Sequence, residues 1–200
     1  MKLVCFPNYT GGALVCDLLN NKTSPFRGSV IASIDHSVFK IGDKGFGVLR
    51  ECDQAIWSTK VNKFKDFTSW FGTHCHPSII KLNDFDEIIS ITTESEQSKW
   101  YRFLRAYYIY FEGHINNIEM LDGLIERIFD EFESHPECKN IEFEDIVNGK
   151  FVEEYNLNIE HFNEWKGLNS WLYSESDPLL VKHFNKRLKK GKRNAIQKPN

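Results

Sequence analysis

A chain of 200 residues, 41% of them hydrophobic, can bury one substantial core, so we expect one domain rather than two. The 14% aromatic content excludes a disordered chain, and the formal net charge of −3 is ordinary for a cytosolic protein. Five scattered cysteines without zinc-type spacing, a short N-terminal apolar run and no run of eighteen apolar residues favour a reduced, cytoplasmic chain over an exported or membrane-spanning one.

The chain begins with the pattern of a strand, a turn and a helix. Residues 2–6 form a continuous apolar run bounded by Pro7, which is typical of a strand buried on both faces. Residues 13–19 place their leucines and Val15 on one helical face. Residues 20–47 are rich in Asn, Ser, Gly and Asp and read as a long connection, a candidate active-site loop.

The middle of the chain holds a second strand and helix pair. Residues 54–72 read as a helix that ends at Gly72, followed by a short strand with a polar turn within residues 71–82. Residues 87–91 are a buried strand. The aromatic residues from Trp100 to Phe111 then recur at three and four residue spacing, which predicts an amphipathic helix.

The last part of the chain adds one strand and several helices. We expect a helix over residues 117–135, a short strand over 140–147, and helices around 159–173 and 178–188. Strands that alternate with helices predict an α/β fold with a mainly parallel sheet flanked by helices. A single domain should therefore cover residues 1–188, followed by a tail.

Residues 189–200 belong to a basic segment. No acidic residue follows Asp177, whereas eight lysines or arginines do. A polyanionic partner would meet the chain here, and contact with nucleic-acid phosphates is one reading. The few aromatic residues and the lack of a known reading module favour a solvated, partly disordered tail instead.

The first turn, "PNYTGGAL", has the shape of a phosphate site. A helix N-terminus offers unpaired N–H groups, Gly11 and Gly12 allow close approach, and Thr10 adds a hydroxyl. It is not a Walker A loop, because the GK[ST] element is absent. A plain βα turn is the alternative.

Two further stretches carry candidate chemistry. His74 and His76 in "THCHP" could act as a general base or as hydrogen-bonded loop residues; a metal site lacks a third ligand. In "TTESEQSKWYRFLRAYY", the side chains of Ser98, Arg102 and Arg105 share a helical face and suit a second phosphate. Pairing of these arginines with surface carboxylates is the alternative.

In this order, the motifs resemble those of the P-loop sulfotransferases. "PNYTGGAL" is similar to the family's P-K-S-G-T-T-W-L loop, "THCHP" to its T-H-x-P turn, and "IISITTESEQSKWYRFLRAYYIYF" to its 3′-phosphate segment. More weakly, "NIEFEDIV" resembles a Y-E-D-L strand end and "KKGKR" an R-K-G segment that contacts the 3′-phosphate. The resemblance covers residues 1–147, with a weaker match beyond.

The resemblance implies a P-loop NTPase-like, sulfotransferase-like three-layer α/β/α fold and sulfuryl transfer from 3′-phosphoadenosine 5′-phosphosulfate to a small-molecule or carbohydrate hydroxyl. It implies a donor site made of Asn8, Tyr9, Thr10, Gly11, Gly12, Ala13, Thr93, Ser98, Arg102 and Arg105. His74 would be the catalytic base, with His76 as the alternative, and no metal is required. Asn8 replaces the family's lysine, so a non-catalytic, nucleotide-binding or partner-binding descendant of the fold is the other reading.

Overall fold

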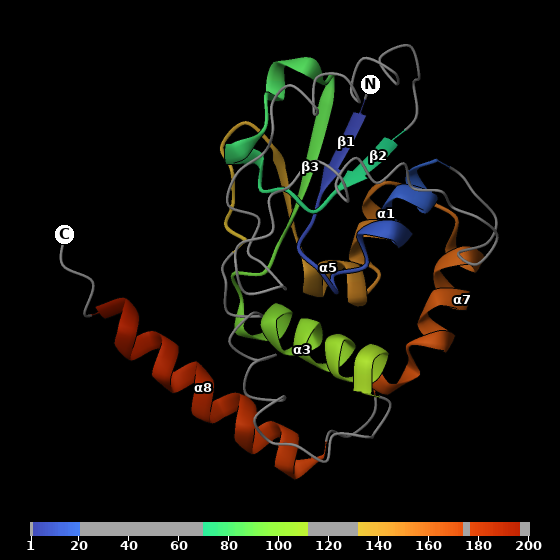
Figure 1. Cartoon of the computed structure of the whole chain (residues 1–200). Helices are drawn as coiled ribbons and strands as arrows, with labels where there is room; N and C mark the ends of the chain where they lie inside the picture. Colours follow the sequence, from blue (N-terminus) through green and yellow to red (C-terminus); the bar gives the residue numbers. More distant parts are fainter. Residues whose placement is uncertain (1, 21–69, 112–131, 174–176, 197–200) are drawn as a thin grey trace.

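The fold is built on a parallel sheet. In the computed structural model, which describes residues 2–20, 70–111, 132–173 and 177–196, the strands are β1 (Lys2–Cys5), β2 (Trp70–Thr73), β3 (Glu87–Thr92) and β4 (Lys139–Glu142). They pair in the order β2-β1-β3-β4, and every pairing is parallel (Figure 1). The prediction of an α/β fold with a parallel sheet is confirmed.

Helices follow the strands. The α-helices are α1 (Gly12–Leu19), α3 (Glu96–Phe111), α5 (Phe143–Val147), α6 (Lys150–Glu154), α7 (Ile159–Leu168) and α8 (Pro178–Ile196). Short 3-10 turns are η2 (Pro77–Ile79), η3 (Leu82–Asp84) and η4 (Ser170–Tyr173). Helix α3 crosses beyond the carboxyl ends of the strands, so its side chains can reach the turns that follow them (Figure 1).

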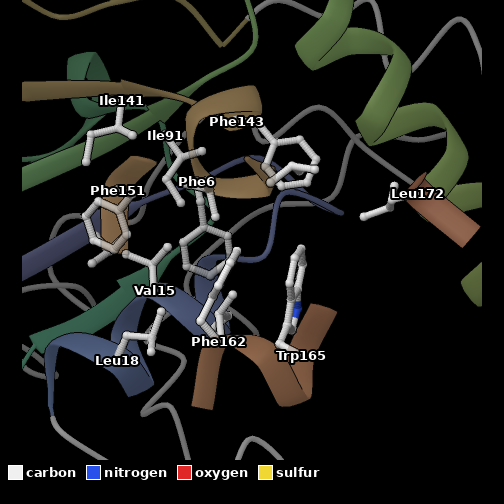
Figure 2. Packing of buried hydrophobic residues seen from close by; sticks show 14 of the residues in the cluster. Phe6, Val15, Leu18, Ile91, Ile141, Phe143, Phe151, Phe162, Trp165 and Leu172 are labelled. Carbon is white, nitrogen blue, oxygen red and sulfur yellow. The ribbon is translucent and has the colours of Figure 1, made fainter. Parts of the chain in front are cut away.

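The two faces of the sheet pack into separate apolar clusters, because side chains alternate along a strand. Val4 and Ile89 join the larger cluster with helices α1, α3 and α5 to α8, whereas Leu3 and Ile88 lie in a smaller one on the other face. Figure 2 shows the larger cluster, with the ring of Phe6 at its centre. Apolar runs without alternation, as in β1, suit strands covered on both faces.

Several sequence predictions differ from the structure. The helix expected to end at Gly72 is wrong at that end, since Gly72 lies inside β2 and pairs with Val4 of β1. The strand predicted over residues 140–147 ends at Glu142, and α5 begins at Phe143. The connection over residues 21–47 and the rest of the predicted helix, residues 54–69, lie outside the described residues, as does most of the helix predicted over 117–135; its last residues, 132–135, are not helical.

Helix α8 runs further than predicted. It begins at Pro178 and continues through Ile196, into the segment expected to be a partly disordered tail. Asp177 caps its start, because the Asp177 Oδ1 accepts a hydrogen bond from the Leu179 N–H at 2.7 Å. Among the described helices, none is long and apolar enough to cross a membrane.

The topology marks one edge of the sheet for a site. From β1 the chain goes to β2 on one side, and from β3 it goes to β4 on the other. The connections of these neighbouring strands therefore diverge, and open α/β sheets bind ligands outside the carboxyl ends of strands at such a point. The turns that follow β1 and β3 lie at this edge.

Candidate functional site

The turn after β1 has an unusual backbone. Tyr9 and Gly11 both adopt the left-handed conformation, with φ of 72° and 69°. A positive φ is uncommon for a residue with a side chain, and such residues concentrate at functional sites. The hydroxyl of Thr10 is buried and donates to the carbonyl oxygen of Pro7 at 2.7 Å, so it holds the turn together rather than facing a ligand.

Gly11 and Gly12 have different roles in the turn. A Cβ on Gly12 would lie 2.0 Å from Cγ of Phe6, so Gly12 is required for packing of the turn on that ring. A Cβ on Gly11 would lie 3.7 Å from the rings of Phe143 and Trp165 and 4.0 Å from a guanidinium nitrogen of Arg105. Gly11 thus places the backbone of the turn beside a cation.

Helix α1 starts at this turn without a side-chain cap. Within the described residues, the backbone N–H groups of Gly12, Ala13 and Leu14 donate no hydrogen bond. Asn8 and Ala13 are exposed, whereas Thr10, Gly11 and Gly12 are buried. Among the described residues, these donors at the positive end of the α1 dipole therefore have no acceptor.

Arg102 of α3 holds the turn from the other side. Its Nε donates to the carbonyl oxygen of Asn8 at 2.9 Å, and the side chain is only 6% exposed. A charged donor on a backbone carbonyl is among the stronger hydrogen bonds of a protein. Arg102 therefore fixes the backbone of the turn and has this role whether or not it touches a ligand.

Arg105, one helical turn further along α3, is a partly buried cation whose nearest described partners are neutral. Its guanidinium lies 5.7 Å from the ring centroid of Trp165, and its Nε is 3.4 Å from the Asn169 Oδ1. No carboxylate pairs with it in the part of the chain that the structure describes. Burial lowers the pKa of Arg105 to about 10, because desolvation disfavours the charged form.

His74 lies next to the same turn. The Phe6 N–H donates to the carbonyl oxygen of Thr73 at 2.9 Å, which joins the chain after β1 to the end of β2. The Nδ1 of His74 is 3.2 Å from the carbonyl oxygen of Phe6. Since a carbonyl only accepts, Nδ1 of His74 donates this hydrogen bond.

His76 has a structural role. Its Nδ1 accepts from the Ser78 N–H at 3.2 Å and caps η2, and its Nε2 is 3.0 Å from the carbonyl oxygen of Glu133. A backbone N–H only donates and a carbonyl only accepts, so both ring nitrogens are engaged. His76 therefore holds the turn after β2, and the catalytic role of His74 stays a prediction.

The turn after β3 is filled by an acidic residue. Ser95 donates to a carboxylate oxygen of Glu144 at 2.8 Å, and the Glu144 N–H donates to the hydroxyl of Ser98 at 3.0 Å. Ser98 is fully buried, and Thr93 is 1% exposed with a hydroxyl that has no hydrogen-bond partner among the described residues. The structure therefore joins Ser98 to Glu144, while Arg102 and Arg105 reach the turn after β1.

Two side chains around Arg105 gave no signal in the sequence. Trp165 belongs to α7, whose spacing predicts only an amphipathic helix, and Asn169 follows it as the C-terminal cap. Their role depends on how α7 packs against the turn after β1. No local sequence pattern reveals this packing. Within the described residues, no group of three or more His, Cys, Asp or Glu side chains could hold a metal ion.

Comparison with known proteins adds no relative. No protein-family model, no curated protein and no solved structure matches this chain. The site must therefore be interpreted from its own chemistry: two arginines, unused backbone donors and a histidine at the carboxyl end of β1.

Proposed function

We propose that the chain binds the phosphate group of a nucleotide at the carboxyl end of β1, as a sulfotransferase-like protein whose donor is 3′-phosphoadenosine 5′-phosphosulfate. The partly buried guanidinium of Arg105 beside Gly11 carries this proposal, because its partners among the described residues are a neutral amide and a ring, and none is a carboxylate. A partly desolvated charge without a counter-charge is costly, and a bound oxyanion would reduce that cost. The N–H groups at the start of α1 would supply further donors to the same oxyanion.

In the proposed reaction, the acceptor oxygen attacks sulfur and the bond between sulfur and the bridging phosphate oxygen breaks. The sulfuryl group moves to the acceptor, 3′-phosphoadenosine 5′-phosphate leaves, and Nε2 of His74 takes the hydroxyl proton. Arg105 would stabilise negative charge that develops on the transferring group or the leaving phosphate. Arg105 would partly replace the lysine that P-loop sulfotransferases carry at the position of Asn8.

A non-catalytic nucleotide-binding protein is the second candidate. Asn8 is neutral and exposed, and Arg102 is already used to hold its carbonyl oxygen. Phosphate binding needs only the turn and Arg105, whereas transfer needs a charge near the sulfuryl group as well. Both candidates predict binding of the bisphosphate, and only the first predicts a sulfated product.

Calorimetry with 3′-phosphoadenosine 5′-phosphate tests binding, with adenosine and inorganic sulfate as matched ligands. We expect the bisphosphate to bind, adenosine to bind at least tenfold more weakly, and Arg105→Gln to lose most of the difference. Absence of binding at millimolar bisphosphate would overturn both candidates. Incubation with the phosphosulfate and a set of phenol, alcohol and sugar acceptors, read by mass spectrometry, then separates them: a sulfated product supports the first and its absence the second.

A further inference from the structure

Helix α8 is anchored at one end and projects at the other. Leu180 and Phe184 are buried, and the Phe184 ring centroid lies 4.9 Å from that of Trp100 and 5.7 Å from that of Phe103. Leu188 packs against the same cluster, so the apolar residues recur every four positions along one face. Figure 1 shows the C-terminal half of α8 to one side of the other described elements.

The opposite face of α8 is basic and exposed. Lys182, Lys186 and Lys189 are all exposed, and their spacing of four and three places them on one face of the helix. The helix continues with Lys190, Lys192 and Arg193 and contains no acidic residue. Lys182, Lys186 and Lys189 thus form a basic stripe on a chain whose net charge is −3.

Several lysines outside α8 are paired with carboxylates. Lys81, Lys139 and Lys150 each form an ion pair, with Asp84, Glu154 and Asp145 respectively. In the described part of the chain, Lys182, Lys186 and Lys189 form none. Among the described residues, the charge of these three lysines is therefore not neutralised by a carboxylate.

We propose that the basic face of α8, formed by Lys182, Lys186 and Lys189, binds the phosphate backbone of a nucleic acid without reading its sequence. A row of cations on a rigid helix matches a row of phosphates and releases their counterions on binding. Among the described side chains of α8, the exposed ones include no aromatic residue for base stacking, so contact is with the backbone. This inference does not depend on the proposed nucleotide site.

An anionic membrane is the less suitable partner. Amphipathic helices that bind membranes insert an apolar face between the lipids. In α8 that face is already buried against α3 through Leu180 and Phe184. Leu179 and Val181 are exposed, but they lie at the start of the helix, away from its basic end. The free face of the basic half is charged, which suits a soluble polyanion.

Fluorescence anisotropy of the full chain with labelled 24-base-pair DNA and RNA duplexes tests the inference at several salt concentrations. The triple variant K182Q/K186Q/K189Q removes three exposed cations and leaves the packed face intact. The control K81Q/K139Q/K150Q changes the net charge by the same amount, but at lysines outside α8. Far-ultraviolet circular dichroism checks that both variants keep their helices.

We expect micromolar or tighter binding at low salt, with a Kd that rises steeply with salt. The α8 variant should raise the Kd at least about tenfold and reduce the slope of log K against log salt by about 2.7, or 0.9 for each lost contact. The control should stay within about twofold of the original chain. Equal losses in both variants, no binding of either duplex, or tighter binding to phosphatidylserine vesicles or polyglutamate than to the duplexes would overturn the inference.

Discussion

The Nε of Arg102 donates a hydrogen bond of 2.9 Å to the carbonyl oxygen of Asn8, across 94 positions of sequence. This bond joins α3 to the turn after β1 and places Arg105, one turn further along the helix, beside Gly11. The strained turn, the start of α1 and two arginines thus form one unit at the carboxyl end of β1. Its stability and its binding capacity can be tested separately.

Arg102→Met should destabilise the fold. It removes a charge-assisted hydrogen bond and leaves the Asn8 carbonyl without that donor, so we expect the free energy of unfolding to fall by about 2 kcal/mol. Lys99→Met, on the same helix, is the control and should change it by less than about 0.5 kcal/mol. Urea denaturation measures both, and equal losses would contradict the role given to Arg102.

Gly12→Ala should also destabilise, because its Cβ would overlap the Phe6 ring at 2.0 Å. Overpacking of this kind costs about 1–3 kcal/mol. The cost should shrink in a Phe6→Leu background, which a double-mutant cycle by urea denaturation would show. Gly167→Ala is the control, since no atom lies within 4 Å of its Cβ; it should stabilise α7 by about 0.5 kcal/mol.

The parts of this fold that are predictable from sequence are those fixed by local pattern. The apolar runs of β1 and β3 and the spacing of Phe103 and Tyr107 in α3 depend on nearby residues alone, and the structure agrees with them. Trp70 and Phe71 fit a helical spacing and an apolar strand equally well, and their pairing with β1 decides for the strand.

The candidate site was only partly predictable from the sequence, because its contacts depend on tertiary packing. The turn after β1 has glycines at the right place, but where the arginines of α3 reach depends on how that helix crosses the strand ends. The sequence placed Arg102 and Ser98 in one phosphate site, whereas the structure connects Arg102 to Asn8 and Ser98 to Glu144. Trp165 approaches Arg105 only through tertiary packing.

Tyr173 should make the fold sensitive to alkaline pH. Burial, with a smaller effect of Tyr101, raises the pKa of Tyr173 from 10.0 to about 12 in the folded chain, and its hydroxyl donates to the Val147 carbonyl oxygen at 2.7 Å. A pKa raised by folding gives a contribution to stability that is complete below pH 10 and is lost as the pH rises towards 12. Tyr173→Phe should therefore flatten the decline of the unfolding free energy over this range, and an unchanged slope would contradict the assignment.

Substitutions of His76 and His74 should have different effects, the first on stability and the second on transfer. His76→Ala loses the bonds to Ser78 and Glu133 and should lower the free energy of unfolding by about 1–2 kcal/mol. If the chain transfers sulfuryl groups, His74→Ala should abolish transfer while the affinity for 3′-phosphoadenosine 5′-phosphate stays within about threefold. Thermal denaturation and calorimetry distinguish the outcomes; a large loss of affinity in His74→Ala would make that residue structural instead.

The most direct test of the account is the melting temperature of Arg105→Met with and without 3′-phosphoadenosine 5′-phosphate, with Lys99→Met as control. Removing a partly buried charge that has no carboxylate partner among the described residues should raise the melting temperature of the free protein by about 2–4 °C. The ligand should then stabilise the original chain and the control, by about 2.7 kcal/mol at a hundredfold excess over Kd, and should not stabilise Arg105→Met. A lower melting temperature for free Arg105→Met, together with an undiminished ligand shift, would contradict the assignment of Arg105 to an anion site.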